Sequence, residues 1–213
     1  MRLVFIILAQ FLSGSIWFAG NIAYSGQGGL LSAVQLGFIS GSLLFAFLNL
    51  PDRFSPVRVF FLSAFSGAAF NLAGYFLADH SFLLLSTRML CGICLAGIYP
   101  VGMKIAAAWY PATISRALGW MVGALVLATG TPHLIQAFNW HGDAGFVLVT
   151  TSVLCLAGGM VQLFLVGDGP NLPKASRFNL ALISRIFRHP GFKGASFGYF
   201  GHMWELYAVF AFI

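Results

Sequence analysis

Six long apolar stretches constrain this sequence more than any other feature. Each can cross the hydrocarbon core of a bilayer, which takes about 20 residues. They cover approximately residues 3–24, 32–50, 57–78, 82–108, 116–137 and 146–166. Only 8% of the 213 residues are charged, against roughly 25% in a soluble protein, so the chain cannot cover a water-facing surface. The composition excludes a soluble enzyme, a disordered chain and a disulfide-rich secreted domain. It predicts an all-α polytopic membrane protein surrounded by the lipid bilayer.

The stretch 167–194 divides the chain, because it is polar, basic and contains three prolines. A further apolar stretch begins near residue 195 and is still running at Ile213. A helix that stopped there would leave its last carbonyl groups unsatisfied in lipid, so we expect a fragment of a longer protein. The predicted parts are a six-helix transmembrane bundle at 1–166, a basic cytoplasmic linker at 167–194 and an incomplete seventh span at 195–213.

The start of the first span has the pattern of a secretory signal peptide, with Arg2 followed by LVFIILAQFL. The apolar stretch nevertheless continues through IWFAGNIAY, and five further spans follow it. We therefore predict a retained helix.

The Lys and Arg residues predict the orientation. With the N-terminus in the cytoplasm, all of the 11 Lys and Arg residues except Arg88 fall in cytoplasmic segments. The outer loops at 25–31, 79–81 and 138–145 hold none. The positive-inside rule then predicts a multi-pass protein of the cytoplasmic membrane with its N-terminus inside. The net charge of +6 follows from this topology and does not indicate a nucleic-acid partner.

The two halves of the six-span unit resemble each other. LGFISGSLLFA at 36–46 and LGWMVGALVLA at 118–128 are identical at five of eleven positions. One span earlier GSIWFAG at 14–20 is similar to GICLAG at 92–97, and one span later LAG occurs in both halves. Three spans is an odd number, so the second triplet must lie inverted in the membrane, an arrangement typical of secondary transporters. Chance similarity among Gly- and Leu-rich helices is the alternative.

Three cysteines, Cys91, Cys94 and Cys155, lie inside apolar stretches. The first two form a C-x-x-C pair, but no strand–helix unit surrounds it. We expect small residues in packed helices and no metal site. A redox or metal-binding pair is the alternative.

The loop between the second and third stretches reads LNLPDRFSPVR at 48–58. It resembles the G-x-x-x-D-R-x-G-R-[RK] loop of the major facilitator superfamily (MFS), with Asp52 and Arg53 matching. Both glycines and the final basic pair are replaced, which leaves Arg58 just beyond the motif. In that family the aspartate pairs with basic groups and helix ends to hold the cytoplasmic side shut. The resemblance thus implies a gating role for Asp52, Arg53 and Arg58, and a solvated loop whose charges only set topology is the alternative.

Arg88 lies inside the fourth stretch, four residues before Gly92, as in the R-x-x-x-G motif of the same family. It lies about seven residues from the outer end, roughly 10 Å deep, where a charge costs at least about 2.5 kcal/mol unless it faces water or a partner. We expect it to face the central cavity, and the resemblance implies a role in proton coupling or substrate binding. The alternative is a side chain that extends to the outer interface.

The fifth stretch is rich in glycine, as it is in the family, where the run ends in Gly-Pro. Here Thr131 separates Gly130 from Pro132, which weakens the case for antiport. Gly119 and Gly123 are expected to form a small-x-x-x-small contact, and proline inside a span is expected to kink it. The expected helix-packing residues are Gly92, Pro100, Gly119, Gly123, Gly130 and Pro132.

The start of the seventh stretch reads GYFGHMWELYAVF at 198–210. It places His202 and Glu205 three residues apart, on one helical face. An intramembrane carboxylate is a functional candidate, so both join Arg88 as expected transport or proton-coupling residues. A structural glutamate bonded to a neighbouring helix is the alternative.

The resemblance covers the whole chain and implies two six-helix bundles joined by a cytoplasmic linker. The predicted fold is an MFS-type bundle with inverted 3+3 helix repeats, truncated in the seventh span. The expected partner is the missing C-terminal six-helix half of the same protein. In the family, spans 1, 4 and 7 line the cavity. Single polar or aromatic residues in these spans can instead bond or pack against a neighbouring helix. The expected cavity residues are Trp17, Asn21, Tyr24, Tyr99, Trp204 and Tyr207.

The predicted function is a secondary active transporter that moves a small solute by alternating access, with H⁺ as the expected driving ion and no cofactor. A membrane-embedded enzyme would need a nucleophile–base pair, a metal cluster or paired carboxylates. The four Asp residues lie in or near loops and far apart, so we expect no catalytic residue and no enzyme. A half-length membrane protein without transport of its own is the third hypothesis.

Overall fold

The computed structural model describes residues 1–25, 27, 29–138, 142–172 and 186–212, with the backbone alone at 206, 207 and 209–212. These residues form helices and no strand, which confirms the predicted all-α class. They fall into two units, Met1–Ser176 and Arg177–Ile213, each with its own internal contacts.

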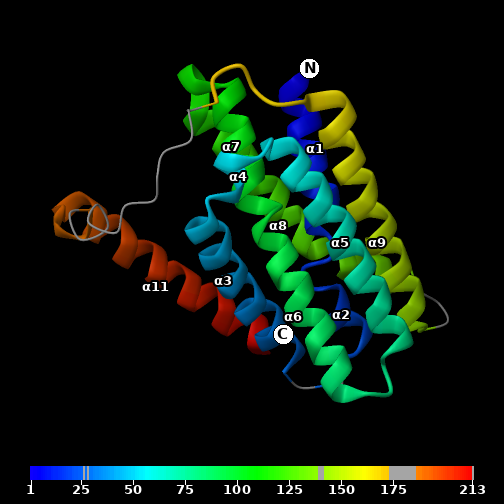
Figure 1. Cartoon of the computed structure of the whole chain (residues 1–213). Helices are drawn as coiled ribbons and strands as arrows, with labels where there is room; N and C mark the ends of the chain where they lie inside the picture. The colour runs from blue at the N-terminus through cyan, green and yellow to red at the C-terminus, as the bar shows by residue number, and fades with distance from the viewer. Residues whose placement is uncertain (26, 28, 139–141, 173–185, 213) are drawn as a thin grey trace. The chain divides into compact units, whose positions relative to one another are not determined.

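Six membrane-length helices make up the first unit (Figure 1). They cover Arg2–Ala23, Leu30–Leu48, Pro56–Phe76, Ser81–Trp109, Pro111–Ala137 and Ala144–Val166. Each is long and apolar enough to cross a membrane, and the six fall on the six predicted stretches with boundaries that differ by a few residues.

Several spans consist of more than one helical segment. Span 1 contains α1 (Arg2–Gly14) and α2 (Ala19–Ala23), and span 4 contains α6 (Ser81–Ala96) and α7 (Tyr99–Trp109). Spans 2, 3 and 5 contain α3 (Leu30–Leu48), α5 (Pro56–Phe76) and α8 (Ile114–Ala137), the last preceded by the 3-10 turn η1 (Pro111–Thr113). Span 6 contains α9 (Ala144–Val161) and the π-helical turn η2 (Gln162–Val166). The short α4 (Leu50–Arg53) lies between spans 2 and 3, and α11 (Pro190–Phe212) belongs to the second unit.

Spans 1 and 4 are both interrupted. In span 1 residues 15–18 form turns between α1 and α2. In span 4 two residues separate α6 from α7, and Pro100 lies in the first turn of α7, where its missing N–H costs no helical hydrogen bond. Pro132 lies inside α8, which nevertheless continues to Ala137.

The packing of the spans follows the predicted inverted repeat. Helix α3 packs extensively on α6, and its counterpart α8 packs on α1. In the same way α5 packs on α6, and its counterpart α9 packs on α1, while α5 and α9 pack on each other. A two-fold relation between spans 1–3 and spans 4–6 requires this set of neighbours.

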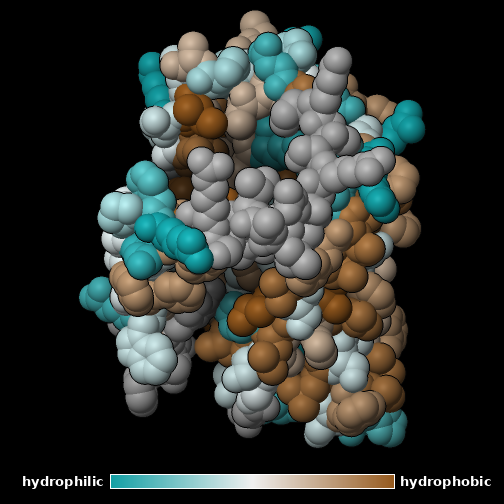
Figure 2. All heavy atoms as spheres, turned by 60° about the vertical axis from the view of Figure 1, so that its left-hand side comes forward, coloured by the Kyte–Doolittle hydropathy of each residue, from teal (hydrophilic) through white to brown (hydrophobic). Residues whose placement is uncertain are grey.

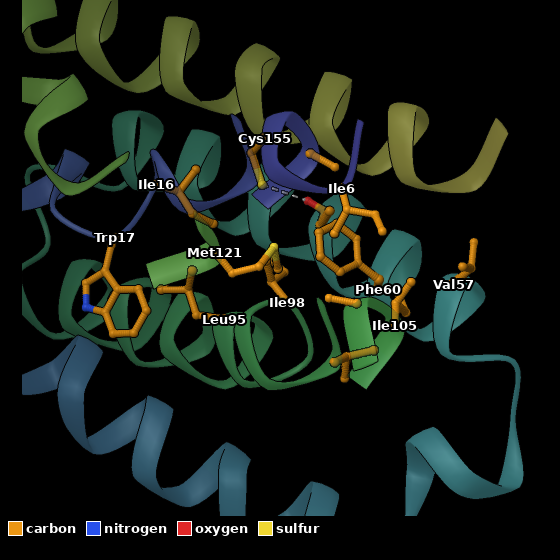
Figure 3. Packing of buried hydrophobic residues seen from close by; sticks show 14 of the residues in the cluster. Ile6, Ile16, Trp17, Val57, Phe60, Leu95, Ile98, Ile105, Met121 and Cys155 are labelled. Carbon is orange, nitrogen blue, oxygen red and sulfur yellow. Dashed lines mark hydrogen bonds between the residues drawn. The ribbon is translucent and has the colours of Figure 1, made fainter. Parts of the chain in front are cut away.

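The core of the bundle is apolar and its outer surface is apolar too. Figure 3 shows Met121 of span 5 among buried side chains of spans 1, 3 and 4, such as Ile6, Phe60 and Ile98. On the outside Phe76 is 74% exposed and Leu127 is 67% exposed, and Figure 2 shows apolar side chains gathered over one face. An exposed apolar surface of this extent suits lipid rather than water.

Candidate functional site

Arg88 lies in the interior of the first unit, only 1% exposed. Its Nη1 donates a hydrogen bond to Asn71 Oδ1 at 2.8 Å. Its Nη2 donates to the carbonyl oxygens of Ile16 at 3.0 Å and Trp17 at 2.9 Å. The charge is therefore surrounded by three neutral acceptors from spans 1 and 3.

The interruption of span 1 supplies two of these acceptors. Ile16 and Trp17 lie between α1 and α2, where the helical hydrogen-bond ladder is broken. Helix α2 then resumes with Gly20 against the guanidinium: a Cβ at that position would lie 2.6 Å from Arg88 Nε. A side chain at Gly20 would thus displace the arginine from the break.

Asn71 extends the arginine's contacts to span 6. Its Nδ2 donates to Leu148 O at 3.1 Å, Thr151 Oγ1 at 3.0 Å and Ser152 Oγ at 2.9 Å. Asn71 is 1% exposed, and its amide is bonded on both sides. We call Arg88, Asn71 and their partners from spans 1 and 6 the arginine network, and it joins spans 1, 3, 4 and 6.

The position of Arg88 differs from the expectation that it faces the cavity and from the alternative that it extends to the outer interface. Its expected role in proton coupling or substrate binding stays a prediction. Within this unit the side chain does not face an open cavity, and it does not extend to the outer surface. No carboxylate pairs with it among the described residues. The reason is the break in span 1, because free carbonyl groups there offer the guanidinium a polar site inside the bundle. Asn71 and Gly20 were missed as site residues, although Asn71 is a polar residue in mid-span.

Two expected cavity residues of span 1 have polar atoms without a protein partner. Trp17 is 5% exposed, and its ring centroid lies 4.9 Å from that of Phe38. Its Nε1 and the Oδ1 of Asn21 make no hydrogen bond within the described part of the chain. Both atoms are themselves buried, so they lack a hydrogen bond inside the unit and not at an open surface.

The two expected tyrosines of the first unit are half-buried. The hydroxyl of Tyr24 donates to Gly74 O at 3.3 Å, which ties the C-terminal end of span 1 to span 3. Burial, with smaller contributions from Tyr75 and two carboxylates, raises the pKa of Tyr24. Tyr99 is the first residue of α7, next to the interruption of span 4.

The remaining candidates lie in the second unit. His202, Trp204 and Glu205 are on α11, and the side chain of Tyr207 lies outside the described residues. Their roles stay predictions.

The Asp52 carboxylate forms an ion pair, but with a residue that the motif did not indicate. It pairs with Lys104 of α7, whose Nζ also donates to Pro51 O at 2.9 Å. Arg53 and Arg58 are exposed, and neither pairs with Asp52. The loop between spans 2 and 3 is thus fastened to span 4.

The chain that leaves span 6 folds over the ends of spans 3 and 4 (Figure 1). The Asp168 carboxylate accepts a hydrogen bond at 3.0 Å from the backbone N–H of Val57, in the first turn of α5. Trp109 Nε1 donates to Gly167 O at 3.1 Å. Asn171 Nδ2 donates to Ala108 O at 3.1 Å. We call residues 167–171 the strap.

The small residues pack closely in spans 2 and 4, but not at the expected places in span 5. A Cβ at Gly92 would collide with backbone atoms of α3, and Gly37 and Gly41 of α3 approach α6 equally closely. Gly119, Gly123 and Gly130 have no atom within 4 Å of an added Cβ, so the expected close contact is not made within the described residues. Helix α8 buries a different face, made of Ala117, Met121, Ala124, Ala128, Thr131 and Pro132.

The three cysteines are buried and unpaired. Cys155 donates through Sγ to Ala64 O at 3.4 Å (Figure 3), and Cys91 donates to Gly67 O at 3.6 Å. They act as small packing residues between helices, as expected. Among the described residues no group of His, Cys, Asp and Glu could hold a metal ion.

Comparison with known proteins relates this chain to a protein family. Over 148 residues the chain is 30% identical to a Haemophilus influenzae protein named "Putative metabolite transport protein", which covers 64% of this chain. The chain spans about a third of the length of that relative, 34%. No solved structure matches the chain. The model of the family described as Major Facilitator Superfamily matches residues 2–213. These findings indicate a transporter family rather than an enzyme, and the chain belongs to the major facilitator superfamily.

Proposed function

We propose that the protein is a secondary active transporter that moves a small solute across the membrane by alternating access. Family membership supports transport, and the name of the Haemophilus influenzae relative supports a metabolite as the solute. The single observation that carries the proposal is the interrupted span 1 held by Arg88. Interrupted helices in transporters expose backbone groups at the site where substrate and coupling ions bind.

The arginine network supports the rigid-body part of this mechanism. Alternating access needs a half that moves as one piece around the bound solute. Hydrogen bonds from Arg88 and Asn71 link spans 1, 3, 4 and 6 at one level of the bundle. The first unit then acts as one rigid half, and the C-terminal six-helix half of the same protein completes the cavity.

We assign the solute contacts to polar and aromatic residues of spans 1, 4 and 7. Trp17 Nε1 and Asn21 Oδ1 have no protein partner among the described residues. Tyr24 directly follows α2, and Tyr99 is the first residue of α7. From the second unit Trp204 and Tyr207 complete the set. Indole, amide and phenol groups suit a small polar metabolite.

Coupling to H⁺ is assigned to Glu205, with His202 one helical turn away. Arg88 acts in this scheme as a positioning residue that holds span 1 rather than as a proton carrier. The Asp52–Lys104 ion pair acts as a latch on the cytoplasmic side. In this scheme the protein lies in the cytoplasmic membrane with its N-terminus inside. The absence of Lys and Arg from residues 25–31, 79–81 and 138–145 supports this orientation.

The test is driven uptake by the intact protein in liposomes, screened over a panel of radiolabelled metabolites. With a solute identified, we expect Glu205→Gln to abolish uptake driven by a pH gradient while solute exchange at equal pH persists. Asp79→Asn, which removes an exposed carboxylate in an outer loop, is the matched control and should leave both assays unchanged. Full driven uptake by Glu205→Gln would remove Glu205 from the mechanism.

A further inference from the structure

Two glutamines of the first unit are buried without a protein partner. Gln10 of span 1 and Gln162 of span 6 are both 0% exposed. Neither the oxygen nor the nitrogen of either carboxamide makes a hydrogen bond within the described residues. Asn71 is equally buried, yet its carboxamide is bonded on both sides. Burial alone therefore does not explain the two free carboxamides.

The bundle makes room for the carboxamide of Gln10. Gly102 of α7 lies against it, and a Cβ at that position would collide with Gln10 Oε1. The same point lies 3.2 Å from Met121 Cε and 3.4 Å from Phe60 Cε2. Figure 3 shows Met121 and Phe60 within the buried apolar cluster. The Gln10 amide thus lies against the backbone of α7, with Met121 and Phe60 close to the same point.

Gln162 lies near the C-terminal end of span 6. It begins the π-helical turn η2, which packs against α1 and α5. A π-helical turn departs from regular helix geometry, and such turns are frequent at functional sites. The free carboxamide of Gln10 therefore lies on α1 and that of Gln162 lies on η2, and these two elements contact each other.

We propose that ordered water is bound inside the first bundle, on the carboxamides of Gln10 and Gln162. A buried amide that gives up its bonds to bulk water is destabilising unless another group replaces them. Buried waters in proteins occupy places of this kind, where polar groups have no protein partner. The site is separate from the solute cavity, because both side chains are fully covered by the first unit itself.

Met121 offers a direct test, because its side chain is 0% exposed and lies beside Gln10. Brief X-ray radiolysis of the intact protein turns bound water into hydroxyl radicals, which oxidise a methionine next to that water to the sulfoxide. We expect mass spectrometry to find Met121 oxidised in the unaltered protein. Gln10→Leu should reduce the rate of Met121 oxidation at least fivefold. Met1, which is fully exposed, serves as the internal control and should oxidise at the same rate in both.

The outcomes are distinct. If Met121 stays unmodified while Met1 is oxidised, no water lies beside Gln10 and the proposal is overturned. Equal oxidation of Met121 in the unaltered protein and in Gln10→Leu overturns it as well, because the Gln10 amide then binds no water next to Met121. If Gln10→Leu fails to fold, the result for the unaltered protein still decides.

Discussion

Two cationic groups of the first unit, Arg88 and Lys104, are held in opposite ways. Arg88 is buried and bonded to neutral carbonyl and amide oxygens. Lys104 is partly exposed and paired with the carboxylate of Asp52, with side-chain exposures of 21% and 24%. A buried charge depends on every one of its partners, whereas an exposed pair contributes little and is screened by salt. The buried arrangement of Arg88 suits a permanent joint between spans. The partly exposed Asp52–Lys104 pair suits a contact that forms and breaks.

The largest expected effect follows from removing Asn71. Asn71→Leu leaves the Nη1 of Arg88 without an acceptor while the charge stays buried, so we expect the free energy of unfolding to fall by about 3–5 kcal/mol. The measurement is equilibrium unfolding in mixed micelles. Asn71→Asp keeps an acceptor for Arg88 and should recover part of the loss. An Asn71→Leu protein as stable as the unaltered one would show that the arginine network is not a joint.

A smaller effect is expected at Gly20. Gly20→Ala places a methyl group against Arg88 and should cost about 1–3 kcal/mol through overpacking. Gly119→Ala is the matched control, because an added Cβ there meets no described atom. The same unfolding assay applies to both. Equal losses at Gly20 and Gly119 would mean that a part of the protein outside the described residues packs on α8.

The smallest effect is expected at the ion pair. Lys104→Met should change the free energy of unfolding by about 1 kcal/mol or less, and the difference should shrink at high salt. Unfolding in low and high salt measures both values. The Asn71→Leu loss should not depend on salt, because the network is buried. A large loss for Lys104→Met that persists at high salt would make the two cations equivalent and remove the contrast between them.

Much of the fold was predictable because membrane spans depend on local composition. Each span buries its own backbone hydrogen bonds, so the apolar stretches alone locate the six helices. The repeat between 36–46 and 118–128 agrees with the packing, in which α3 on α6 and α8 on α1 are corresponding pairs. Prolines were informative as well, since the interruption of span 4 falls next to Pro100.

The surroundings of Arg88 were not predictable in the same way. The interruption at residues 15–18 contains no proline, so nothing in the pattern marked it as a break. Because the break was not predicted, the carbonyl groups of span 1 could not be predicted as partners of Arg88. A water-filled cavity was the natural expectation for a buried arginine. The position of Arg88 therefore depends on tertiary structure that the spacing of residues does not encode.

The prediction of the packing face of span 5 was wrong for a different reason. Glycine and alanine both permit close helix contact, and α8 carries both kinds of residue on different faces. Which face meets α1 depends on the rotation of the helix about its axis, and that rotation is set by the whole bundle. The alanine face is buried, so the glycine pattern predicted the wrong side for contacts within this unit.

The strap determines which residues of the first unit bear a tension applied to the chain beyond it. Residues 167–171 are bonded to the beginning of span 3 and to the end of span 4, so the chain is not free where span 6 stops. Tension arriving from beyond residue 172 loads Ala108 and Val57 before it can reach η2. The strap therefore moves the last fixed point of this unit's chain from the end of span 6 to spans 3 and 4.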